Sequence, residues 1–97
     1  MATYIVLSSF TDQGIRAVKD TTKRSDQVRE LAKRFGATVK EIYWTLGSHD
    51  VVAIFDAPDD KSITALGLAI GNQGFVRTQT MRAFTKEEMT GILGKLG

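Results

Sequence analysis

His49 and Asp50 are neighbours in the sequence and are residue types that act together in acid–base catalysis. A histidine titrates near neutral pH, and a nearby carboxylate raises its pKa and orients its ring. Adjacent residues on a strand point to opposite faces, so these two side chains meet only if a turn bends them together. The alternative is a hairpin turn in which Asp50 accepts backbone N–H bonds and His49 lies at the rim. We favour this structural interpretation, which leaves His49 and Asp50 as catalytic candidates without an assigned reaction.

A second group of residues could line a ligand site: Tyr4, Tyr43, Glu41 and Arg82. Tyr43 and Glu41 share one phase of a predicted strand, and Tyr4 belongs to a mixed aromatic and polar row on the first strand. Such rows suit a cavity between two sheets that has aromatic walls and a few polar groups. They suit a subunit interface equally well, because tyrosine is enriched there. We favour the interface.

Arg82 and Trp44 raise the question of what covers their strands. If the face that carries Arg82 is covered, its guanidinium needs a carboxylate or an anionic ligand. The candidate carboxylates are Asp56, Glu41 and Asp12, and we expect a structural ion pair. Trp44 could line an aromatic or haem pocket, but its phase in the strand favours a core position facing the helices.

The composition excludes several kinds of site. The chain has 97 residues, no cysteine and one histidine, which excludes thiol chemistry, disulfides and a multi-histidine metal site within one chain. We therefore expect no metal and no cofactor. Thirteen basic and eleven acidic residues give a net charge of +2, and the basic residues between positions 16 and 34 alternate with acidic ones as on a solvated helix face. Neither a nucleic acid nor a membrane is an expected partner.

The N-terminus and the hydropathy pattern favour a cytoplasmic protein. No apolar run reaches the eighteen or so residues that a membrane span needs, and no basic segment precedes the short apolar run at residues 4–7, as it would in a secretion signal. That run is rich in β-branched and aromatic residues, which indicates a strand.

Hydrophobic periodicity predicts four strands, with three helices and one short helical turn between and after them. The predicted strands cover residues 3–10, 39–46, 51–55 and 75–84. A short helical turn with Ile15 and Val18 facing inward could follow the first strand.

Three longer helices are indicated by apolar spacing and by residues that favour helix ends. Apolar residues at helical spacing from Val28 to Phe35 end at Gly36, and Ser25 or Thr22 could cap this helix. A second helix follows Asp59 or Asp60 as cap, and the sequence Asn72-Gln73-Gly74 closes it. Its Gly67 and Gly71 suggest close packing. A capping box, Thr85 with Glu88, predicts a C-terminal helix.

The order of these elements predicts a single domain over residues 1–97 with an α+β, ferredoxin-like βαββαβ fold and an added C-terminal helix. Its four-stranded antiparallel sheet has the order 4-1-3-2. Strands 1 and 3 are apolar in both phases, as central strands covered on both faces would be. Two helices cover only one face, so either the third helix or a second subunit covers the other. We favour a second subunit, and hence a homodimer or higher homo-oligomer.

Five short motifs resemble those of the GYD-domain proteins, in the same order along nearly the whole chain. They lie at residues 10–16, 35–36, 46–52, 57–60 and 76–85. The resemblance implies a small bacterial protein of the dimeric α+β barrel superfamily, in which two ferredoxin-like sheets pack face to face. It does not imply a settled biochemical activity.

The sequence departs from the motif that gives the family its name, which is glycine, a variable residue, tyrosine and aspartate. Gly47 and Asp50 match this motif, but His49 occupies the tyrosine position. An activity that depends on the tyrosine hydroxyl in relatives would therefore be altered here.

Two functions remain open at this stage. The favoured one is a non-enzymatic homo-oligomeric module, binding a small molecule or acting as a scaffold, assembled through its open sheet face. The alternative is a small oxygenase or isomerase, cofactor-independent or haem-dependent, in which His49 is the acid–base group and Tyr43 or Trp44 forms the wall of the site.

Overall fold

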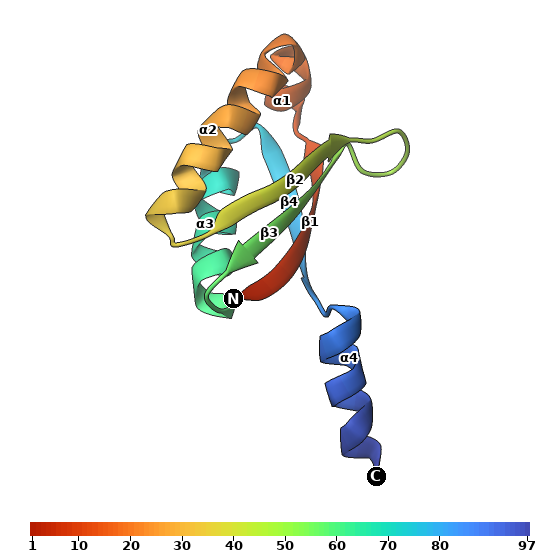
Figure 1. Cartoon of the computed structure of the whole chain (residues 1–97). Helices are drawn as coiled ribbons and strands as arrows, with labels where there is room; N and C mark the ends of the chain where they lie inside the picture. The colour runs from red at the N-terminus through yellow and green to blue at the C-terminus, as the bar shows by residue number, and fades with distance from the viewer.

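A twisted four-stranded antiparallel sheet forms the centre of the molecule (Figure 1). The computed structural model describes residues 1–97. The strands are β1 (Ala2–Phe10), β2 (Thr38–Trp44), β3 (Val51–Ala57) and β4 (Val76–Ala83). Their order in the sheet, β2-β3-β1-β4, is the predicted order counted from the other edge. The ferredoxin-like α+β fold is thus confirmed, with the doubly apolar β1 and β3 in the middle.

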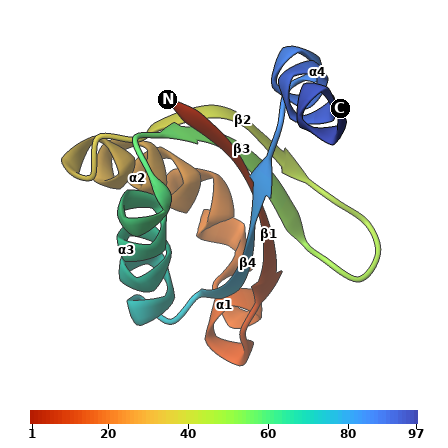
Figure 2. The same cartoon turned by 90° about the horizontal axis from the view of Figure 1, so that it is seen from below.

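Two of the four helices cover one face of this sheet. The helices are α1 (Asp12–Arg16), α2 (Thr21–Arg34), α3 (Asp60–Asn72) and α4 (Lys86–Leu93), with 3₁₀ turns at Val18–Asp20 and Gly94–Leu96. Figure 2 shows α2 and α3 on the same side of the strands, while α4 lies apart on the other side. None of these helices has the length and hydrophobicity that a transmembrane segment requires.

Most of the predicted helix ends are confirmed. The Asp59 carboxylate accepts a hydrogen bond from the Ser62 backbone N–H at 2.8 Å and caps α3. Gly36 follows α2 with a φ of +73°, the left-handed conformation that glycine adopts most readily. The α2 cap is different from the prediction, because this helix begins at Thr21, directly after Asp20. Neither predicted capping residue therefore caps it.

The hydrophobic core lies between the sheet and the helices α2 and α3. Phe55 and Leu66 are its largest fully enclosed side chains, exposed by 2% and 1%. Two sequence expectations about packing are wrong. Ile15 and Val18 are exposed by 54% and 37%, because α1 and the following turn lie beyond the end of the sheet. Nothing lies within 4 Å of a Cβ built on Gly71, so this glycine serves no close approach.

The opposite face of the sheet has no helix over it. Ile5 pairs in register with Ile54 of β3 and Met81 of β4, and Leu7 pairs with Val52. These five apolar side chains share one face, because residues opposite each other in a ladder point to the same side. This face of the sheet is called the open face below.

Candidate functional site

The centre of the open face is apolar and reachable by solvent. Ile5, Leu7, Val52 and Ile54 are only half-buried although they lie on the two central strands, and Met81 is 40% exposed. The residues that surround them on the same face are mostly polar, namely Thr3, Ser9, Glu41, Tyr43, Asp56, Arg77 and Gln79. An apolar centre with a polar rim is the usual anatomy of a protein–protein interface.

Tyr43 and Glu41 lie together at the β2 edge of the open face. The Tyr43 hydroxyl donates a hydrogen bond to Glu41 Oε2 at 3.2 Å, and the tyrosine is 54% exposed. The negative charge of Glu41, together with this hydrogen bond, raises the pKa of Tyr43. Both side chains are available to a partner that covers this face.

Tyr4 lies on the other face of the sheet, beneath the helices. It is 2% exposed, and its hydroxyl donates to Asp60 Oδ1 at 2.5 Å at the start of α3. This hydrogen bond, together with burial and the charge of Asp60, raises the pKa of Tyr4. The four proposed ligand-binding residues are therefore not one site, because Tyr4 and Tyr43 lie on opposite sides of the sheet.

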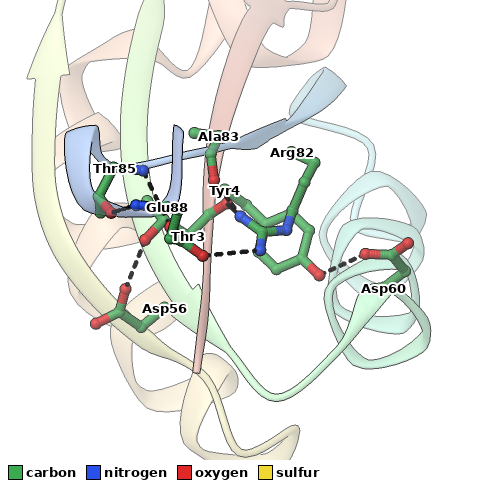
Figure 3. Close-up of polar contacts among 8 residues, drawn as sticks. All are labelled: Thr3, Tyr4, Asp56, Asp60, Arg82, Ala83, Thr85 and Glu88. Carbon is green, nitrogen blue, oxygen red and sulfur yellow. Dashed lines mark hydrogen bonds and ion pairs between the residues drawn. The ribbon is translucent and has the colours of Figure 1, made fainter. Parts of the chain in front are cut away.

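Arg82 is bound within the molecule, as Figure 3 shows. Its Nη2 lies 3.3 Å from Glu88 Oε2, and its Nη1 donates to the backbone carbonyls of Thr3, at 3.4 Å, and of Ala83. The guanidinium also stacks over the Phe84 ring, with 4.5 Å between its Cζ atom and the ring centre. Arg82 thus has the structural ion pair that we expected, but with a different carboxylate.

The three carboxylates expected to pair with Arg82 have other positions. Asp56 lies on the open face, where it accepts a hydrogen bond from Thr3 and pairs with Lys40 at 3.5 Å. Glu41 bonds to Tyr43, and Asp12 belongs to α1 at the far end of β1. These three predicted partners of Arg82 are wrong. The alternation of side chains along a strand does not show which residue of the following segment, here Glu88, folds back to meet Arg82.

Arg82 and a capping box together fix the start of α4. Thr85 Oγ1 accepts from the Glu88 backbone N–H at 3.1 Å, and Glu88 Oε1 accepts from the Thr85 N–H at 3.0 Å, as predicted. The hydrogen bond from the Thr85 N–H has the larger effect on Glu88, and the contact with Arg82 adds to it. Together they hold the pKa of Glu88 below its usual range. These contacts lie at the point where α4 leaves the body of the molecule (Figure 1).

An exposed apolar stripe follows on α4 and the turn after it. Its members are Met89, Ile92, Leu93 and Leu96, exposed by 42%, 38%, 56% and 82%. Their i, i+3, i+4, i+7 spacing places them on one side of the helix. Like the open face, this stripe presents large apolar side chains to solvent.

His49 and Asp50 lie in the loop between β2 and β3. The Asp50 carboxylate accepts from the Phe10 backbone N–H at 2.8 Å, and the Asp50 N–H donates to the Ser8 carbonyl at 2.8 Å. Asp50 therefore ties the loop to the end of β1. His49 Nδ1 is enclosed and has no hydrogen-bond partner. Gly47 enters the loop with a φ of +122°, where glycine is strongly preferred.

The prediction that Trp44 is a core residue is wrong, because its side chain is 43% exposed. Its phase does face the helices, and its Nε1 donates to Thr21 Oγ1 at 3.0 Å at the start of α2. The side chain lies at the margin of the helix layer because Trp44 ends the edge strand β2. No group of three or more His, Asp or Glu residues is placed to hold a metal ion.

Sequence reasoning named Asp60 and Glu88 only as helix-capping residues and missed their contacts with Tyr4 and Arg82. Asp60 directly follows Asp59, the cap of α3. In the sequence, two aspartates at the start of a helix indicate only a favourable interaction with the helix dipole, and nothing points to a contact with Tyr4. Glu88 was recognised as a capping residue, but its contact with Arg82 spans the boundary between β4 and α4. A strand-to-helix turn has no fixed spacing from which such a pair could be read.

Comparison with known proteins places this chain in a family. The sequence model described as GYD domain matches residues 4–93. A protein of Thermus thermophilus, named glutamine synthetase and cystathionine beta-lyase binding protein, is 34% identical over 94 residues. The similarity covers 96% of this chain and 99% of that protein. With its ferredoxin-like fold and these two matches, the chain belongs to the GYD domain family.

Proposed function

We propose that this protein is a non-catalytic binding protein that self-associates through its open face and, once assembled, docks onto other proteins. The observation that carries the proposal is the apolar centre of the open face, formed by five side chains on three adjacent strands. Soluble monomers seldom leave a large contiguous apolar patch of this kind in water.

The total surface area supports a missing partner. A compact monomer of 10.7 kDa is expected to expose about 5,500 Å², whereas this chain exposes 6534 Å². The excess is about 1,000 Å², and a stable interface typically buries about 800 Å² on each partner. The chain therefore carries enough surplus surface for one interface of ordinary size.

The rim of the open face favours a second copy as the partner. Glu41 and Tyr43 lie at the β2 edge, and Arg77 lies on β4 at the other edge of the same face. In a two-fold interface, a contact between residue i of one copy and residue j of the other occurs twice, with the two copies exchanged. Opposite charges at the two edges can then face each other when the sheets stack.

Helix α4 supports the same arrangement. It leaves β4 on the side away from α2 and α3, so a second sheet stacked on the open face would come within reach of its apolar stripe (Figure 2). A helix of eight residues is marginal in water by itself. Contact with the second copy would stabilise it.

The relative named above supports a choice of protein partners. That protein is named for binding glutamine synthetase and cystathionine beta-lyase. We propose a glutamine synthetase of the same organism as the first partner to test, since the similarity extends over the whole domain. The oxygenase or isomerase alternative has less support, because the Asp50 carboxylate is engaged by the Phe10 N–H and His49 and Asp50 share no side-chain hydrogen bond.

Self-association is tested by placing a charge in the open face. Met81→Glu should weaken association at least tenfold in sedimentation velocity, because the carboxylate would be buried unpaired between two sheets. Leu68→Glu is the matched control: Leu68 is 71% exposed on α3, in the helix layer, and its variant should associate as the wild type does. A monomeric wild type, or equal association of both folded variants, would contradict the proposal.

Enzyme docking is tested separately. We expect the wild-type protein to co-sediment with purified glutamine synthetase in a saturable ratio. This test measures binding alone and requires no catalytic activity of the protein. Absence of co-sedimentation at tens of micromolar would reject this partner while leaving self-association to the preceding test.

A further inference from the structure

A half-open cavity of about 80 Å³ lies on the helix side of the sheet, away from the open face and α4. Its floor is the end of β1 with neighbouring residues of β2, β3 and β4, and its walls come from the start of α2 and the end of α3. Eleven of its seventeen lining residues are hydrophobic, among them Val28, Phe55 and Ile70. The start of α4 lies at the other end of β1, beside Thr3.

Arg24 of α2 brings a positive charge to this apolar cavity. Its guanidinium stacks over the Phe75 ring with 4.4 Å between Cζ and the ring centre. Its Nη2 atom is buried and has no hydrogen-bond partner. The ion pairs of the structure join Lys33 to Glu30, Lys40 to Asp56 and Arg82 to Glu88, so Arg24 takes part in none of them.

No aspartate or glutamate lines the cavity to balance this charge. Arg24 as a whole is half-buried, but its Nη2 is a buried donor without an acceptor, which is costly. The remaining polar lining consists of neutral groups, including the register partners Ser8 and Thr78, which add hydroxyls. A bound anion would supply both the missing acceptor and the missing charge.

We propose that this cavity binds a short aliphatic monocarboxylate, whose carboxylate pairs with the Arg24 guanidinium and whose hydrocarbon part fills the apolar space. A guanidinium has the planar set of donors that a carboxylate matches. A single cation suits a singly charged ligand better than a phosphate dianion. The cavity has about half the volume of the 150 Å³ site that holds benzene in another protein, so it has room for a hydrocarbon part of about three or four carbons. A branched acid of about four or five carbons, with its carboxylate at Arg24, therefore fits best.

The test is a titration of the full-length protein with sodium 3-methylbutanoate, followed by two-dimensional NMR and calorimetry. We expect saturable shifts at Ser8, Val28 and Phe75. Binding should be at least tenfold tighter than that of the neutral 3-methylbutanamide, which lacks the charge, and of acetate, which lacks the hydrocarbon part. Equal binding of acid and amide, or no saturation by tens of millimolar, would overturn the proposal.

Two variants locate the anion within the molecule. Arg24→Gln should reduce the affinity for 3-methylbutanoate at least tenfold, whereas Arg34→Gln, which removes the same charge from an exposed position of α2, should change it less than twofold. Equal losses in both variants would mean that only net charge matters, which overturns the site. If Arg24→Gln does not fold, the wild-type shift map decides, because shifts that avoid the cavity residues also reject it.

Discussion

At the scale of single residues, the two tyrosines show how one residue type acquires two environments. Tyr4 is enclosed beneath the helices and donates to Asp60, whereas Tyr43 is mostly exposed on the open face and donates to Glu41. Both hydroxyls donate to carboxylates, which favours the neutral phenol in each case. Tyr4 is therefore a structural residue, and Tyr43 belongs to the proposed interface.

The Tyr4–Asp60 contact predicts a pH dependence of stability. The folded state raises the pKa of Tyr4 above its ordinary value of 10.0, so its contribution is present below pH 10 and is lost as pH rises through the folded-state pKa. In a Tyr43→Phe variant, the remaining tyrosine should titrate above pH 10 by ultraviolet absorbance while the protein is folded. A midpoint at or below 10 would contradict the assignment.

The same contact has a measurable effect at neutral pH. Tyr4→Phe should lower the free energy of unfolding by about 1 kcal/mol, since a typical hydrogen bond is removed and the exposed Asp60 is rehydrated. Denaturant unfolding measures this change, with Tyr43→Phe as the control.

At the scale of secondary-structure elements, α4 is the least supported helix of the molecule. It contains Gly91, has Gly94 as its C-terminal cap, and has no fully buried residue. Each glycine within a helix costs up to about 1 kcal/mol relative to alanine. Its capping box and Arg82 therefore account for much of its local stability, and association would supply the rest.

This dependence predicts that α4 frays in acid before the rest of the domain does. The folded state lowers the pKa of Glu88 below its ordinary value of 4.5, so the contribution of its carboxylate is present above that pH and is lost as pH falls below it. The protection factors of the amides of residues 86–93, which correct for the intrinsic effect of pH on exchange, should fall below pH 4.5 more than those of β1. In Glu88→Gln these protection factors should already be lower at pH 7, and unchanged values there would argue against this role.

At the scale of the whole molecule, the shape is extended for so short a chain. The radius of gyration is 14.5 Å, compared with about 12.5 Å for a compact domain of this length. The longest dimension is 52 Å and the shortest is 18 Å, because α4 projects beyond the sheet (Figure 1). A two-layer fold with a projecting helix has one face and one arm free for partners.

Self-association predicts that thermal stability depends on concentration. Any partner that binds only the folded state raises the unfolding midpoint, and here the partner is another copy. The Tm of the wild type should rise between 1 and about 100 µM protein in calorimetry or circular dichroism. Met81→Glu should show no such rise, whereas a concentration-independent wild-type Tm would contradict a folded-state oligomer in this range.

The elements, their order and most of their ends can be predicted from the sequence alone. Asp59, Gly36 and the Thr85–Glu88 capping box act within one helical turn of their partners, so their effects can be read from spacing alone. The apolar residues in both phases of β1 and β3 identified the central strands and the face that no helix covers. This local information was sufficient to predict the fold. It did not show that the candidate ligand-binding residues lie on two different faces of the sheet.

The contacts between distant residues become visible only in the folded molecule. The tertiary structure placed Tyr4 and Tyr43 on opposite faces, paired Arg82 with Glu88 and exposed Trp44 at the margin of the helix layer. It also left the buried Nη2 of Arg24 without a hydrogen-bond partner. The physical reason is that these contacts depend on strand register, on the direction in which the chain leaves β4 and on how α2 lies over the sheet. Each of these follows from packing over the whole domain, and none is encoded in the spacing of neighbouring residues.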